Sequence, residues 1–325
     1  MFYFKFKGKR YCIKTGGILL LATVGLICGL LLGEVGVRMF VKIPLEKEYL
    51  RFGVFQYERI PERLIDKDVF WKRDCEFRGK IYSKEKPEDS IRVACLGDSC
   101  TEAPDLSVEQ TYTYFLERKI NSLLEGKKIE VMNCGVGGYS SLQALRYLKK
   151  EISLYHPDIV IAWVGIHDST SAWFYEDKEQ RMPPAGGDKS ILEKSSLFLF
   201  LKNYQELSNN INSCLLRVSL MDSEKNCREI VAALREYNAY PVFIIPFSVG
   251  RKSNAVFYSY LGGYCGLLKE LASTSQCTII DLVPWLRSQD NLSELFLDVC
   301  HPSEKGNRMI ANYIAENLLK LGILE

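Results

Sequence analysis

Short apolar runs alternate with helical patterns along the C-terminal two thirds of the chain. Apolar residues recur at the helical spacing of three and four, as at Leu142, Leu145 and Leu148. The residues that follow Asp158 up to Val164 are all apolar, which is typical of a strand buried on both faces of a parallel sheet. The strands are expected at 91–97, 129–133, 158–164, 241–246 and 278–282. The helices are expected at about 108–124, 141–155, 223–237, 258–273 and 303–321.

This alternation predicts an α/β protein, a three-layer α/β/α sandwich around a five-stranded parallel sheet. One connection departs from the pattern. Residues 169–220 form an insertion of about fifty residues between the third strand and its crossover helix. Such a long connection is more often a lid or a binding region than a plain loop.

The longest apolar run, 16–33, has eighteen residues and no charge. As a helix rising ~1.5 Å per residue it spans about 27 Å, close to the thickness of a bilayer core. No small-residue cleavage site follows it, and a buried core helix would carry polar residues on one face. We therefore expect an uncleaved transmembrane helix over residues 16–40.

Charge orients this anchor. The whole chain has a net charge of +2, which gives no electrostatic basis for binding nucleic acid. Residues 1–43 hold seven Lys or Arg and one Glu, and most of the basic residues precede the apolar run. This predicts a cytoplasmic tail at 1–15 and a body outside the cytoplasm, periplasmic or extracellular. Residues 41–90 are charged and aromatic without a clear period, as in a stalk, and 91–325 form the folded domain.

Chemistry-bearing residues follow the ends of the expected strands, where ligands bind in an open parallel sheet. Ser99 comes directly after the first strand, at a turn where free backbone N–H groups can stabilise an oxyanion. A serine nucleophile needs a base, and His301 lies on the same edge with Asp298 three residues before it. His156 begins the third strand on the opposite edge, so we interpret it as a surface or capping residue.

These segments resemble the SGNH/GDSL hydrolase superfamily over about residues 90–321. The matching blocks are Gly97-Asp98-Ser99, the glycine turn ending at Gly138, Gly165-x-x-Asp168 and Asp298-x-x-His301. The anchor and the exported body look like bacterial membrane-anchored members.

The resemblance implies a flavodoxin-like fold and cleavage of acyl esters through a serine acyl-enzyme, without metal or cofactor. It makes Ser99 the nucleophile, His301 the base and Asp298 the orienting carboxylate. The backbone N–H groups of Ser99 and Gly138 would bind the oxyanion.

One position departs from the family. His167 stands where the family usually has asparagine, whose side chain is a further oxyanion donor. A neutral imidazole N–H can also donate one hydrogen bond. Asp98, Asp168 and Trp173 are further candidates for contacts with substrate.

Several alternatives compete with the esterase. A dinucleotide site at 135–138 lacks its third glycine, because Ser140 stands there. A metal site built from the three aspartates and His301 would leave the Ser99–His301 pair without a purpose. An O-acyltransferase remains open, since water or a sugar hydroxyl can accept the acyl group. A membrane-tethered, weakly catalytic domain that binds a glycan or a protein also remains. An O-acetylated cell-envelope carbohydrate is the first substrate hypothesis.

The chain has eleven cysteines and no Cys-x-x-Cys, which argues against zinc ribbons and thioredoxin-type redox pairs. Cys100, Cys134 and Cys300 each adjoin a motif residue. We interpret them as small buried hydrophobic residues, and a disulfide that braces the site is the alternative.

Overall fold

The computed structural model describes most of the chain, in two compact units. The described residues are 2–6, 9–13, 15–40, 77–124, 126–170, 172, 176–179, 195–198, 200–201, 215–249, 261–275 and 277–324. One unit comprises Met1–Arg51 and Pro183–Ser213, and the other comprises Phe52–Met182 and Cys214–Glu325.

The larger unit is built on a five-stranded sheet with the order β4-β3-β5-β6-β7, in which every neighbouring pair is parallel. The strands are β3 (Ser90–Gly97), β4 (Lys128–Gly135), β5 (Ile159–Trp163), β6 (Tyr240–Ile244) and β7 (Thr278–Ile280). In order of appearance this is 2-1-3-4-5, the flavodoxin-like order. The predicted fold class and all five predicted strands are confirmed.

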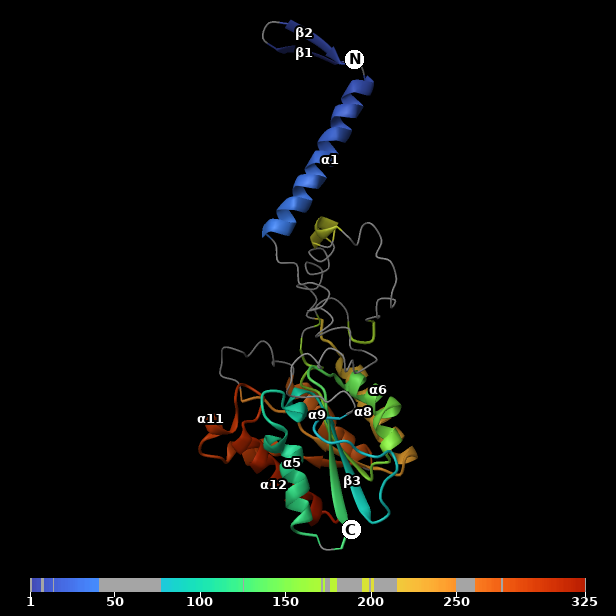
Figure 1. Ribbon diagram of the computed structural model, residues 1–325, viewed down its shortest axis with the longest axis vertical. Helices are drawn as coiled ribbons and strands as arrows, with labels where there is room; N and C mark the ends of the chain where they lie inside the picture. Colours follow the sequence, from blue (N-terminus) through green and yellow to red (C-terminus); the bar gives the residue numbers. More distant parts are fainter. Residues whose placement is uncertain are drawn as a thin grey trace. The chain divides into compact units, whose positions relative to one another are not determined.

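Helices cover both faces of this sheet (Figure 1). They are α4 (Ser99–Glu102), α5 (Tyr112–Asn121), α6 (Ser141–Lys150), α8 (Leu220–Glu236), α9 (Leu261–Thr274), α10 (Leu282–Arg287), α11 (Leu292–Leu295) and α12 (Glu304–Lys320), with the 3₁₀ turns η1 (Val108–Gln110) and η2 (Ile152–Tyr155). The sequence patterns did not predict α10 and α11, which are short.

The two-residue period of a strand decides which side chain enters which core. Val93 and Cys95 of β3 pack into the core beneath α5 and α12. Ala94 and Leu96 pack into the core beneath α6 and α8. Seven of the eight residues of β3 are buried, and the remaining one, Ile91, is partly buried. The strand that leads to Ser99 is therefore held from both sides.

Residues just before β3 also belong to this packing. Phe77 is buried, and its ring contacts those of Tyr82 and Tyr155. Arg92, buried at the start of β3, donates to Glu130 and to the carbonyl of Ser83. The residues just before β3 thus add to the core that lies beneath α6 and α8.

The smaller unit contains a hairpin of β1 (Phe2–Phe6) and β2 (Lys9–Ile13), followed by α1 (Thr15–Phe40). The hairpin was not predicted. Within α1, Ala22–Phe40 is long and apolar enough to cross a membrane. A signal sequence near the N-terminus can have the same length and composition. Glu34 of α1 accepts hydrogen bonds from the Ser195 hydroxyl at 2.8 Å and from the amide of Leu197 at 2.8 Å. Part of the 169–220 insertion therefore contacts α1.

Replacing Gly135 by alanine should destabilise the larger unit by about 1–3 kcal/mol, the usual cost of overpacking. The new Cβ would lie 2.1 Å from the backbone nitrogen of Glu102, which cannot swing aside as a side chain would. Gly262→Ala in α9 is the control, because a Cβ there meets nothing within 4 Å. The urea midpoint should fall for Gly135→Ala, whereas it should stay or rise for Gly262→Ala, because alanine favours a helix. An unchanged midpoint for Gly135→Ala would contradict the close packing.

Candidate active site

Ser99 is the first residue of α4, directly after β3. Asp98 caps this helix, since its Oδ1 accepts the amide N–H of Cys100 at 2.8 Å. Gly97 makes the sharp turn possible, because a Cβ there would lie 2.3 Å from the Thr101 hydroxyl oxygen. The turn places the Ser99 side chain at the C-terminal edge of the sheet.

His301 lies between Ser99 and Asp298. Its Nε2 is 2.8 Å from Ser99 Oγ, and its Nδ1 is 2.6 Å from Asp298 Oδ2. Asp298 Oδ1 accepts the amide N–H groups of Cys300 and His301, each at 2.8 Å. Two backbone bonds therefore fix the carboxylate, which in turn orients the imidazole.

The pKa values of His301 and Asp298 are shifted in opposite directions. The contact with the Cys300 side chain and the bond with the Asp298 carboxylate raise the pKa of His301 above its ordinary value. Partial burial opposes ionisation of Asp298, but the amides of Cys300 and His301 outweigh it and lower the pKa of that carboxyl. Asp298 is therefore ionised wherever His301 titrates.

The glycine turn after β4 lies on the other side of Ser99. A Cβ built on Gly137 would be 3.9 Å from Ser99 Cβ. The Gly137 amide donates to Glu102 Oε2 at 2.5 Å, so it is already engaged. Gly138 has a φ of +81°, a conformation that favours glycine. Within the described part of the chain, no acceptor is found for the amides of Ser99 and Gly138.

His167 lies in the turn after β5, with its Nε2 3.9 Å from Asp98 Oδ2 and its side chain one quarter exposed. Removal from water, together with the positive charges of Arg217 and His301, lowers the pKa of His167 to about 3. The imidazole is therefore neutral at pH 7, with one N–H to donate.

Asp168 was predicted to contact substrate, but both of its carboxylate oxygens are bonded to groups inside the protein. It is fully buried. Its Oδ1 accepts the amide of Ser141 at 2.7 Å, and its Oδ2 accepts the hydroxyl of Ser223 at 2.6 Å. Both oxygens are thus used to join β5 to α6 and α8.

Asp98 is likewise buried, and its Oδ1 caps α4, whereas its Oδ2 has no hydrogen-bond partner among the described residues. Its predicted contact with substrate stays a prediction. Burial raises the pKa of Asp98 to about 7. Trp173 lies outside the described residues. His156 is exposed and caps η2 at its C-terminal end, as expected for a residue on the far edge.

Arg217 supports the glycine turn, and the sequence reasoning missed it. Its guanidinium donates to the Gly138 carbonyl at 2.8 Å and to Gln143 Oε1 at 3.0 Å. It also pairs with the buried carboxylate of Asp177, at 3.1 and 2.9 Å. Arg217 and Asp177 both belong to the insertion, so the insertion holds the turn that carries Gly138. A buried ion pair has no signature in a single sequence.

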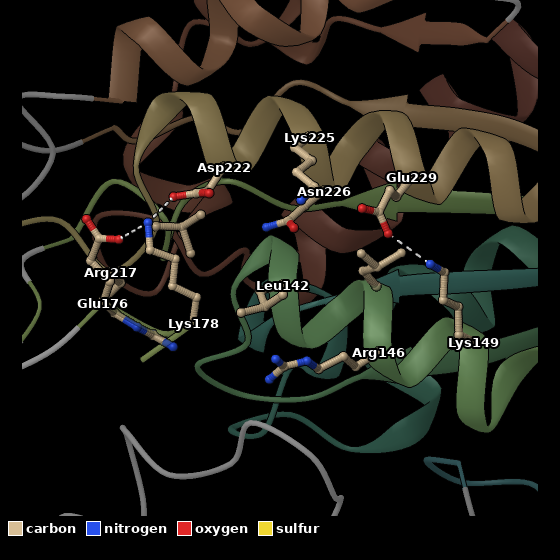
Figure 2. A pocket seen from close by; sticks show the side chains of 12 residues that line it. Leu142, Arg146, Lys149, Glu176, Lys178, Arg217, Asp222, Lys225, Asn226 and Glu229 are labelled. Carbon is tan, nitrogen blue, oxygen red and sulfur yellow. Dashed lines mark hydrogen bonds and ion pairs between the residues drawn. The ribbon is translucent and has the colours of Figure 1, made fainter. Parts of the chain in front are cut away.

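Arg217 also lines a pocket between α6 and α8 (Figure 2). Two of the lysines around this pocket pair with its carboxylates: Lys178 with Glu176 and Asp222, and Lys149 with Glu229. Arg146 and Lys225 also line it. Its lining includes neither Ser99 nor His301. We assign no chemistry to this pocket.

Comparison with known proteins identifies the family. The model of the GDSL-like Lipase/Acylhydrolase family matches residues 95–309, well over half of the chain. The chain therefore belongs to this family and is a hydrolase by that membership, as its fold and site suggested. No curated protein matches it.

Among solved structures, the chain is similar to the lipase/acylhydrolase from Enterococcus faecalis, with 16% identity and a TM-score of 0.49, covering 70% of this chain and 95% of that one. It is also similar to an acetylxylan esterase from Geobacillus stearothermophilus, with 16% identity and a TM-score of 0.48, covering 70% and 94%. A psychrotrophic esterase from Pseudoalteromonas gives 15% identity and a TM-score of 0.48, covering 71% and 97%.

Arg217→Met should destabilise the protein by about 3–5 kcal/mol, because it removes the guanidinium that pairs with the buried Asp177 carboxylate. The double variant with Asp177→Asn should recover part of this loss. Lys178→Met is the control: its ion pairs are exposed and should contribute less than about 1 kcal/mol. Denaturant unfolding measures all three. If Arg217→Met and Lys178→Met lowered the free energy of unfolding equally, the buried ion pair would contribute no more to stability than the exposed one.

Proposed function

We propose that this protein is a serine ester hydrolase that uses Ser99, His301 and Asp298 as a catalytic triad. The observation that carries the proposal is the unbroken hydrogen-bond chain of 2.8 Å from Ser99 to His301 and 2.6 Å from His301 to Asp298. Three residues from two distant segments meet in the order that nucleophilic catalysis needs.

In this mechanism Ser99 Oγ attacks the carbonyl carbon of the ester while His301 Nε2 takes the hydroxyl proton. Asp298 keeps the other ring proton on Nδ1 and stabilises the imidazolium. His301 then gives its proton to the departing alcohol, and an acyl-enzyme remains. Water, deprotonated by the same Nε2, attacks the acyl group; the carboxylic acid leaves, and His301 returns its proton to Ser99 Oγ.

The negative oxygen of the tetrahedral intermediate would be bound by the amides of Ser99 and Gly138. Removing one such donor commonly costs about 10²–10³ in rate. His167 would supply a third, neutral N–H in place of the family's asparagine. Arg217 acts indirectly in this scheme, because it positions the Gly138 peptide through the carbonyl.

For the substrate, we propose an O-acetyl ester of a cell-envelope carbohydrate. The support is the apolar helix α1: as an anchor, with the basic N-terminus in the cytoplasm, it would hold the hydrolase domain outside the cytoplasm beside the envelope. Transfer of the acyl group to a sugar hydroxyl uses the same acyl-enzyme. Free acetate released from an acetylated glycan, measured against acetyl transferred to added sugar, separates the two reactions.

Ser99→Ala and His301→Ala should each abolish covalent labelling by a fluorophosphonate probe. The first lacks the nucleophile and the second lacks its base. Ser122→Ala, exposed at the end of α5, is the control and should label like the parent. Undiminished labelling of folded Ser99→Ala would refute the assigned nucleophile. An unlabelled parent would favour the weakly catalytic binding domain, with His167 as the first residue to replace.

The rate kcat/KM should fall on acidification, with a midpoint above the ordinary histidine pKa of about 6.5. The base works only when neutral, and a raised pKa means that it becomes protonated at a higher pH. Asp298→Asn should move this acid limb to lower pH, besides lowering the rate. A pH–rate profile of both proteins on an acetyl ester is the measurement, and a limb that stays in place would argue against the Asp298–His301 pair.

A further inference from the structure

Two thiols adjoin the proposed triad. Cys100 follows Ser99 and Cys300 precedes His301, and both are buried. The two sulfur atoms and a ring nitrogen of His301 all lie within 4.8 Å of one another. Cys300 Sγ is 3.7 Å from His301 Nδ1, and Cys100 Sγ is 3.4 Å from the Cys300 carbonyl oxygen. The proposed ester chemistry uses neither thiol.

These three donors match the ligand preferences of zinc. Thiolate sulfur and imidazole nitrogen bind Zn²⁺ at about 2.3 and 2.0 Å in a tetrahedron, which puts the donor atoms about 3.5–4 Å apart. Separations of up to 4.8 Å therefore need to close by about 0.8–1.3 Å at most. The fourth position would stay open to water or to the nearby Asp298 carboxylate.

The site can be reached from the solvent. The side chain of His301 is one quarter exposed and that of Asp298 is half exposed, whereas the thiols lie behind them.

We propose that Cys100, Cys300 and His301 form an inhibitory site for Zn²⁺ beside the catalytic serine. Binding replaces the two thiol protons, which go to solvent, and places the metal on Nδ1. The ring proton then has to reside on Nε2. A protonated Nε2 cannot take the proton of Ser99, and the bond from Nδ1 to Asp298 is lost. Bound metal thus switches off the base without touching the nucleophile.

The inhibitory part of this inference rests on the proposed function, so binding is tested separately. The full chain carrying Ser99→Ala, in detergent and kept reduced with a phosphine, is titrated with Cd²⁺ as a spectroscopic substitute for Zn²⁺. A thiolate-to-cadmium absorption band is expected. Adding Cys100→Ala or Cys300→Ala should remove the part of the band that belongs to this site.

Cys134→Ala is the matched control, because Cys134 is also buried beside a motif residue but packs in the other core. It should keep the full band. Where a Cys→Ala variant does not fold, as judged by thermal unfolding, Cys→Ser and His301→Ala replace it. Identical bands in the parent and in every folded ligand variant would overturn the site.

Inhibition is then measured on the active chain with an acetyl ester. Zn²⁺ should inhibit and a chelator should restore the rate. Cys100→Ala or Cys300→Ala should raise the half-inhibitory concentration at least about tenfold, or 1.4 kcal/mol. Cd²⁺ binding without Zn²⁺ inhibition would overturn the inhibitory role alone. Absence of esterase activity would refute the proposed function and leave the Cd²⁺ titration to decide the site.

Discussion

The close approach of α4 to the ends of β3 and β4 is the constraint on which the site depends. Gly135 leaves room for the backbone of α4, and Gly97 leaves room for the Thr101 side chain, so that Ser99 can stand at the sheet edge. Asn133 adds to this contact, since its amide donates to the Thr101 carbonyl at 2.9 Å. The proposed nucleophile is thus positioned by close packing of the backbone, which leaves it less free to move than a residue on a surface loop.

Buried polar groups connect this rigid edge to the helices around it. The Asp168 carboxylate joins α6 to α8, and Arg217 joins the insertion to the Gly138 peptide. Each group is removed from water, so each needs its partners. The cost of leaving one of them unpaired ties the insertion to the glycine turn and makes the two behave as one structural element.

The sequence predicted most of the fold, because buried parallel strands are apolar throughout and the runs are short. It also predicted that Ser99, His301 and Asp298 lie at one edge of the sheet, since the ends of parallel strands meet there. It could not separate a carboxylate that faces substrate from one that faces the core, and Asp168 was misassigned for this reason. Arg217 escaped notice because its partners lie 79 and 40 residues away in the chain. The β1–β2 hairpin was missed because its basic residues were interpreted as a cytoplasmic tail, although Phe4, Lys5 and Phe6 alternate as in a strand.

The proposed base is controlled by its own loop. The Asp298 side chain is half exposed, so packing alone does not fix its position. An exposed ion pair between two mobile side chains also contributes little to stability. Here both partners stand three residues apart, and two backbone amides fix the carboxylate before the imidazole meets it. The same short loop sets Cys300 beside Nδ1. That nitrogen therefore faces a carboxylate that keeps its proton and a thiol pair that, in the proposed zinc site, would hold a cation in place of that proton. Which of them engages Nδ1 decides whether Nε2 can accept the proton of Ser99.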